Sequence, residues 1–228
     1  MKALPLAAMS SVLGLALSIS AFAKDDFPEV TEDGLHRLAD SKLSVVYTAP
    51  GADLSVYNKV MLLDATVAFK KHWQRDQNRS YSFKVSSKDM DRIKAGLAEL
   101  FNEVFTESLR EGGYAIALET GEDVLIVRPA IVNLDVKAPD TRSVGRGYQL
   151  TRSAGEMTLY IELFDSVTSD IIGKALDRRE DRQHSSFQWQ TQGGNRIAAK
   201  KILKSWAGAL VDALDDAHAA KEASEGVG

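Results

Sequence analysis

The chain has 228 residues, of which 44% are hydrophobic and 26% charged, a composition typical of a globular protein with a sizeable core. It carries 28 basic and 32 acidic residues, and the net charge of −4 gives no reason to expect a nucleic-acid partner. It contains no cysteine, which excludes disulfides, thiolate chemistry and cysteine-ligated metals.

Residues 1–23 have the pattern of a secretory signal peptide. Lys2 gives a positive start, an apolar run broken by small residues follows, and Ala21–Ala23 offer small residues where a signal peptidase cleaves. The run is shorter than the roughly 20 apolar residues of a membrane span, so we expect no transmembrane segment in the mature chain. We predict a mature protein that begins at Lys24 and is soluble in the periplasm, which the intact mass of the exported protein tests.

Sequence periodicity predicts an arm followed by six strands. Residues 24–41 are polar apart from Leu35 and Leu38 and read as an arm. Apolar–polar alternation or short apolar runs then predict strands over residues 42–47, 58–73, 114–119, 121–138, 155–165 and 170–181. Pro129 cannot donate a backbone hydrogen bond, so we expect a bulge or an unpaired side at that point of its strand.

Two segments have the apolar spacing of helices, residues 88–111 and 195–219. Ser86 or Ser87 is a suitable cap for the first helix, and the tail 221–228 is expected to fray. The order of elements predicts an α+β fold over residues 24–220: a two-layer sandwich in which two helices pack on one face of a mixed, mostly antiparallel sheet.

The segment 164–183 is dense in both acidic and basic residues. A catalytic carboxylate pair needs one acid in an apolar pocket, whereas here a basic residue lies beside each acid. This favours a solvated hairpin with cross-strand ion pairs, in which Asp165 caps the turn. We therefore expect neutralisation of Asp177 or Glu180 to change stability by less than about 1 kcal/mol.

Three residues are candidate binding groups on two grounds. Arg128 lies among apolar residues in the middle of a strand, where it would bind an anion or form an ion pair with Glu162 or Asp165. Trp73 and Trp189 lie in polar connections, where an aromatic side chain either docks a partner or packs locally over the sheet end.

The connection 137–155 is long for a compact domain and locally basic, with Arg142, Arg146 and Arg152 among its residues. One interpretation is a mobile loop that contacts an anionic envelope component such as lipid head groups. The other is an ordered β-ribbon that extends the flanking strands.

The sequence predicts no catalytic, cofactor or metal site. Its four histidines are far apart, and none has the spacing of a metal-ligand pair or a catalytic triad. The first hypothesis is a non-catalytic binding or assembly module whose partner is an unknown envelope protein or an anionic envelope component. The alternatives are an envelope hydrolase with an unrecognised site and a structural subunit of an envelope complex.

Several segments together resemble one known family. They are "EDGLHRL", "YTAPGADLSVYNKVMLLDATVAFKKHW", "GEDVLIVRPAIVNLDV", "YIELFDSVTSDIIGKALDRRED" and "KSWAGALVDAL", and in this order they resemble the DUF3313 family of secreted bacterial proteins. The resemblance implies an envelope setting but no activity. Many members carry a lipid-attachment cysteine, which this chain lacks, and here Ser169 stands in the hairpin turn where glycine is usual.

Overall fold

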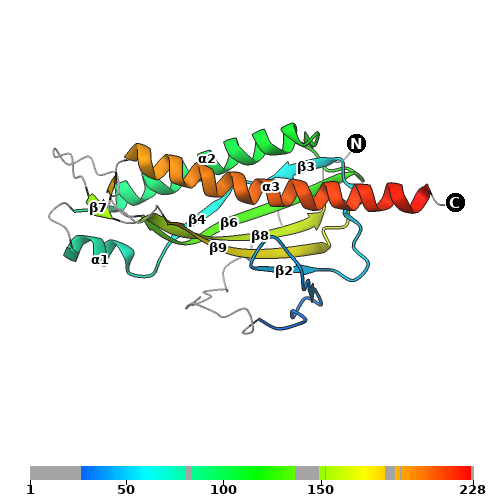
Figure 1. The fold of residues 1–228 in the computed structure, drawn as a ribbon, viewed down its shortest axis with the longest axis horizontal. Coiled ribbons are helices and arrows are strands. Elements are labelled where there is room, and N and C mark those ends of the chain that lie inside the picture. The colour runs from blue at the N-terminus through cyan, green and yellow to red at the C-terminus, as the bar shows by residue number, and fades with distance from the viewer. Residues whose placement is uncertain are drawn as a thin grey trace, which may run out of the picture.

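The computed structural model describes residues 27–80, 84–136, 149–151, 153–182, 188–190 and 192–226. Within them, helices α2 (Ser87–Glu111) and α3 (Gln192–Glu225) form one layer over an eight-stranded sheet, as Figure 1 shows. This arrangement confirms the predicted α+β sandwich.

The sheet is mixed, and its long central strands are antiparallel. The strand order is β1-β2-β9-β8-β6-β3-β5, with β4 also beside β6, and pairing is antiparallel from β1 to β6 but parallel between β6, β3, β4 and β5. The strands are β1 His36–Arg37, β2 Val45–Thr48, β3 Lys59–Leu62, β4 Thr66–Phe69, β5 Ala115–Ile116, β6 Val124–Val136, β8 Ser153–Asp165 and β9 Ile171–Arg182. Two further strands, β7 Gln149–Thr151 and β10 Gln188–Gln190, pair with each other in a separate sheet.

The single strand predicted over 58–73 is wrong, because the segment forms two strands and the start of a helix. Strand β3 ends its pairing at Val127 of β6, and β4 begins its pairing at Ala130. Pro129 of β6 lies opposite the break, where it has no N–H to offer the neighbouring strand. The unpaired side expected at Pro129 is therefore confirmed.

Both predicted helices are present, and the structure contains further helices that were not predicted from the sequence. Ser86 caps α2 in a capping box with Asp89, and a helix not expected from the sequence, α1, spans Trp73–Ser80. A short 3-10 helix, η2, spans Leu54–Val56. The prediction that the tail frays from residue 221 is wrong, since α3 continues to Glu225. No helix within the described ranges is long and apolar enough to cross a membrane.

The main core lies between the helix layer and the sheet. It contains Phe101 and Phe105 of α2, Trp206 of α3, and alternate residues of β6 and β8 such as Ile131 and Leu159. A second, smaller cluster forms on the opposite face of the sheet, where Leu35 of the N-terminal arm packs on Val45 and Tyr47 of β2. The arm thus covers part of the face that the helices leave open.

Candidate functional site

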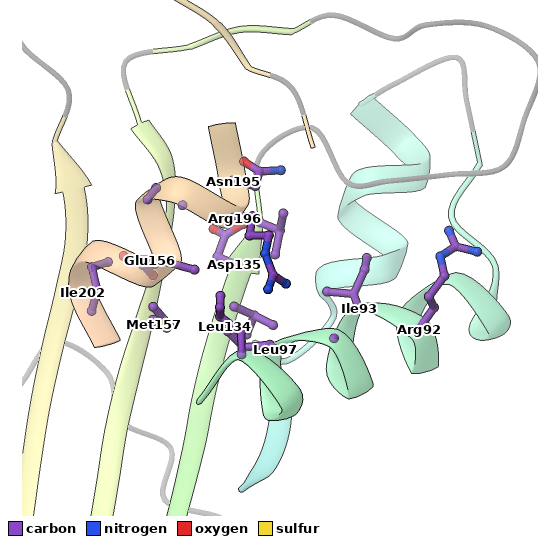
Figure 2. Close-up of a pocket in the computed structure, with 16 residues that line it drawn as sticks. Arg92, Ile93, Leu97, Leu134, Asp135, Glu156, Met157, Asn195, Arg196 and Ile202 are labelled. Carbon is purple, nitrogen blue, oxygen red and sulfur yellow. The ribbon is translucent and has the colours of Figure 1, made fainter. Parts of the chain in front are cut away.

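A pocket of about 420 Å³ lies between α2, α3 and the ends of β6 and β8 (Figure 2). The two helices run in the same direction, and the pocket lies near their N-termini. Along the helix pair, Arg196 is paired with Glu103 and Lys204 with Glu107. We call this ion-paired line, formed by Glu103, Glu107, Arg196, Lys200 and Lys204, the α2–α3 seam.

The helix residues that line the pocket repeat at three- and four-residue spacing. Apart from Arg92 and Arg196, they are Ile93, Gly96, Leu97 and Leu100 of α2, and Asn195, Ala198, Ala199 and Ile202 of α3. This spacing places each set on one face of its helix, turned towards the other. Three of the eight are glycine or alanine, and a Cβ atom on Gly96 would meet no heavy atom within 4 Å. The cavity exists because small residues occupy facing positions that large ones fill elsewhere in the core.

The floor of the pocket is the irregular end of the β6–β8 pair. Leu134, Val136 and Met157 contribute apolar side chains, and the strand register shifts between Val132 and Asp135. Gly155 has a φ of 146°, and a Cβ atom there would overlap the backbone carbonyl of Asp135. Only glycine permits this close approach, so the bulge is fixed by the sequence.

Most charged side chains of the lining gather at one end of the pocket, whereas Arg92, paired with Asp89 at 2.9 Å, lies apart from them in Figure 2. In Figure 2, Asn195, Arg196, Asp135 and Glu156 occupy the upper part, and Leu97, Leu134 and Met157 lie below them. Glu156 is paired with Arg178 at 2.5 Å and lies 3.6 Å from Nζ of Lys70, which is 4.0 Å from Asp135. The pocket therefore has a polar end and an apolar end.

Arg128, a predicted binding residue, forms the ion pair that the sequence left open as an alternative. Its Nε donates to Glu162 at 2.7 Å, and its guanidinium lies 4.6 Å from the centre of the Phe164 ring. The Tyr160 hydroxyl donates to the other oxygen of Glu162 at 2.8 Å, and burial together with this contact raises the pKa of Tyr160. Arg128 thus forms its ion pair on the face of the sheet opposite α2 and α3.

The two tryptophans predicted as docking groups have different outcomes. Trp73 opens α1, is 4% exposed and stacks on Phe69 with ring centres 4.2 Å apart. Of the two interpretations of Trp73, local packing therefore holds and docking of a partner is wrong. Trp189 lies in β10 opposite Leu150, and its side chain is outside the described part of the structure.

The basic residues Arg142, Arg146 and Arg152 lie outside the described residues. Of the connection that contains them, residues 149–151 form β7, which pairs with β10, and residues 153–155 begin β8. Val136, just before the connection, and Gly155, at its end, both line the pocket. Contact between these arginines and an anionic component stays a prediction.

The hairpin prediction is wrong for Asp177 and holds for its neighbour Glu180. Glu180 is exposed, but Asp177 is only 3% exposed, because it faces the helix layer. Its Oδ2 accepts a hydrogen bond from Nε1 of Trp206 at 2.7 Å, and its Oδ1 accepts one from the backbone N–H of Ser44 at 3.0 Å. Asp165 does cap the turn, accepting from the N–H groups of Val167 and Thr168 at 2.9 and 2.7 Å.

Titratable groups with displaced pKa values shift away from neutrality. The N–H of Thr168 and the Tyr57 hydroxyl lower the pKa of Asp165, and the Ser86 hydroxyl lowers that of Asp89. Burial raises the pKa of the Tyr57 and Tyr114 hydroxyls. Across the described ranges, no three His, Asp or Glu side chains come together as metal ligands.

Comparison with known families identifies the chain. The model of the DUF3313 family, described as a protein of unknown function, matches residues 20–210. The chain belongs to the DUF3313 family. A comparison with curated proteins gives no match.

Solved structures with a similar arrangement are distant in sequence. A DUF330-family protein from Xanthomonas campestris is 10% identical with a TM-score of 0.43, and the match covers 75% of this chain and 89% of that one. The PelC dodecamer from Paraburkholderia phytofirmans is 13% identical with a TM-score of 0.34 over 70% of this chain and 95% of that one. A neuraminyllactose-binding hemagglutinin homologue from Helicobacter pylori is 12% identical with a TM-score of 0.34, covering 74% and 90%.

The pocket was not predicted from the sequence. Its signal was present in the inner faces of the two helices, where Gly96, Ala198 and Ala199 interrupt stripes of larger apolar residues. Small residues in a helix also occur where helices pack closely, so the pattern acquires its meaning only when the facing positions are known.

Proposed function

We propose that this DUF3313 protein is a non-catalytic binding module of the cell envelope, which holds a small apolar or amphipathic molecule in the pocket between α2, α3 and the ends of β6 and β8. The observation that carries the proposal is a cavity of about 420 Å³ with apolar walls and a few charged groups at one end. Ligand sites have typical volumes of roughly 300–1,000 Å³ and this kind of lining.

The lining of the pocket supports a binding role. Apolar side chains from α2, α3, β6 and β8 line much of it. Several of its charged groups are already paired within the protein: Glu156 with Arg178, Arg196 with Glu103 and Arg92 with Asp89. The envelope setting rests on the signal-peptide pattern of residues 1–23.

Filling the pocket from α2 tests the proposal. We expect the wild-type protein to bind phenylnaphthylamine, a neutral apolar probe whose fluorescence rises on transfer from water. The variant Gly96→Leu should bind it at least about tenfold more weakly, because the new side chain occupies the cavity. The same variant should melt at an equal or higher temperature, since leucine favours a helix over glycine by roughly 1 kcal/mol.

Two further variants make this test decisive. Ala199→Leu fills the pocket from the opposite wall and should also weaken binding. Gly208→Leu is the matched control, because Gly208 is an α3 glycine outside the pocket lining whose Cβ would also meet no atom within 4 Å. If Gly96→Leu and Ala199→Leu are folded and bind the probe as the wild type does, the pocket is not the binding site.

A further inference from the structure

The two ends of the pocket differ in chemistry, and the difference specifies a class of ligand. We propose that the ligand is a single-chain amphiphile with an anionic head, a carboxylate or a phosphate, and that Arg196 binds this head. The inference rests on the proposed function, since it concerns the same pocket. The head would lie beside Arg196 at the polar end of the pocket, and the apolar end would take the chain.

The acidic groups at the polar end are already neutralised, which disfavours a cationic head. Glu156 is paired with Arg178 and with Lys70, and Lys70 also lies within 4.0 Å of Asp135. A ligand cation would have to displace these lysine and arginine groups from carboxylates that are mostly buried. Because the new ion pairs would only replace existing ones, the net gain in binding free energy would be small.

Arg196 is a pocket-lining cation that the protein can release to a ligand, whereas Arg92, the other arginine of the lining, is paired at 2.9 Å with Asp89, which belongs to the capping box of α2. In the α2–α3 seam, three basic residues share two carboxylates: Arg196 and Lys200 contact Glu103, and Lys200 and Lys204 contact Glu107. If Arg196 turns to a ligand, Glu103 keeps Lys200 as its partner at 3.1 Å. The side chain of Arg196 is 55% exposed, and an exposed pair of this kind contributes little stability.

The chemistry and position of Arg196 suit an anionic head. A guanidinium presents paired N–H donors that match the two oxygens of a carboxylate or phosphate. Arg196 lines the pocket near the N-terminus of α3, where the helix dipole adds to the attraction for negative charge. Beyond it, Leu97, Leu134 and Met157 line the part that an alkyl chain would fill.

Four amphiphiles with the same alkyl chain test the inference by calorimetric titration below their micelle concentrations. They are decanoate, decyl phosphate, decyltrimethylammonium and decyl maltoside. We expect the two anions to bind at least about fivefold tighter than decyltrimethylammonium, and the tighter of the two identifies the head as carboxylate or phosphate. Gly96→Leu should abolish this binding, because it fills the apolar end.

Arg196→Gln and Lys204→Gln form a matched pair in the same seam. Arg196→Gln should lower the affinity for both anions by about five- to tenfold and leave the affinity for decyl maltoside unchanged. Lys204→Gln should leave the affinity for all four amphiphiles unchanged, because Lys204 does not line the pocket.

The outcomes separate this inference from the proposed function. In one set of outcomes, Gly96→Leu abolishes binding while the wild type binds the anions and the cation equally, or while Arg196→Gln leaves binding unchanged. Either result overturns the proposal of an anionic head but keeps the pocket as the binding site. If no amphiphile binds in a way that depends on Gly96, both the inference and the proposed function are wrong.

Discussion

The carboxylate of Asp177 joins three elements of the fold. It lies on β9 and accepts hydrogen bonds from Trp206 of α3, from Ser44 just before β2, and from Arg179 on its own strand. Both oxygens are used: Oδ1 accepts from Ser44, and Oδ2 accepts from Trp206 and Arg179. A buried acceptor with this many donors fixes the position of α3 over the sheet.

We predict that Asp177→Asn destabilises the protein by about 2 kcal/mol or more. An amide offers one acceptor oxygen and a donor in place of two acceptors, so either Trp206 or Ser44 loses its partner. Trp206→Phe, which removes the N–H donor and also leaves a cavity because phenyl is smaller than indole, should cost about 2 kcal/mol or more. Unfolding in urea measures the change in free energy for each variant.

Glu180→Gln is the control for this comparison, because Glu180 is an exposed acid on the same strand. It should change the unfolding free energy by less than about 1 kcal/mol. Equal effects of Asp177→Asn and Glu180→Gln would show that Asp177 does not have the structural role assigned to it.

At the scale of an element, the β8–β9 hairpin contains a strained turn residue. Ser169 has a φ of 63°, in the left-handed region that residues with a Cβ atom rarely adopt. Its N–H donates to the carbonyl of Asp165 at 3.0 Å, which closes the turn. The glycine usual at this position in the family suits that conformation.

We predict that Ser169→Gly stabilises the protein by roughly 0.5–1 kcal/mol. Relief of the left-handed strain is worth about 1–2 kcal/mol, and the greater freedom of glycine in the unfolded chain offsets about 0.5–1 kcal/mol of it. Thermal unfolding should show a higher midpoint. Thr168→Gly, in the same turn but without a positive φ, should lower the midpoint, and an equal response of both variants would refute the strain argument.

At the scale of the whole molecule, the N-terminal arm is part of the folded body. Leu35 is 1% exposed in the cluster with Val45 and Tyr47, and the Tyr47 hydroxyl donates to the carbonyl of Pro28 at 2.8 Å. An ion pair between Asp33 and Lys174 ties the arm to β9. The arm therefore covers apolar surface on the face of the sheet opposite α2 and α3.

We predict that Leu35→Ala costs about 2–5 kcal/mol, the range for removing a fully buried leucine side chain. Leu38→Ala is the matched control, because Leu38 lies in the same arm and is 42% exposed, so it should cost less than about 1 kcal/mol. Unfolding in urea compares the two. Similar costs would mean that the arm does not pack on the sheet as described.

The sequence by itself determined the class of fold, most of the long elements and the family. Helix α2 begins at a cap that Ser86 and Asp89 encode locally, and the long strands β8 and β9 follow from alternation within each segment. Pro129 predicted the interruption of strand pairing at its position, because the missing N–H is a property of the residue itself. Features of this kind need no knowledge of distant parts of the chain.

Only the tertiary structure decided which polar residues are buried and where space remains. The charge pattern around Asp177 is that of a solvated strand, and its burial follows from Trp206, which is distant in the sequence, lying over β9. The pocket likewise depends on Gly96 and Ala199 lining one cavity from two helices that the sequence separates widely. Burial and cavities depend on which surfaces pack against each other. A single sequence shows the residues on each surface but not which surfaces pack together.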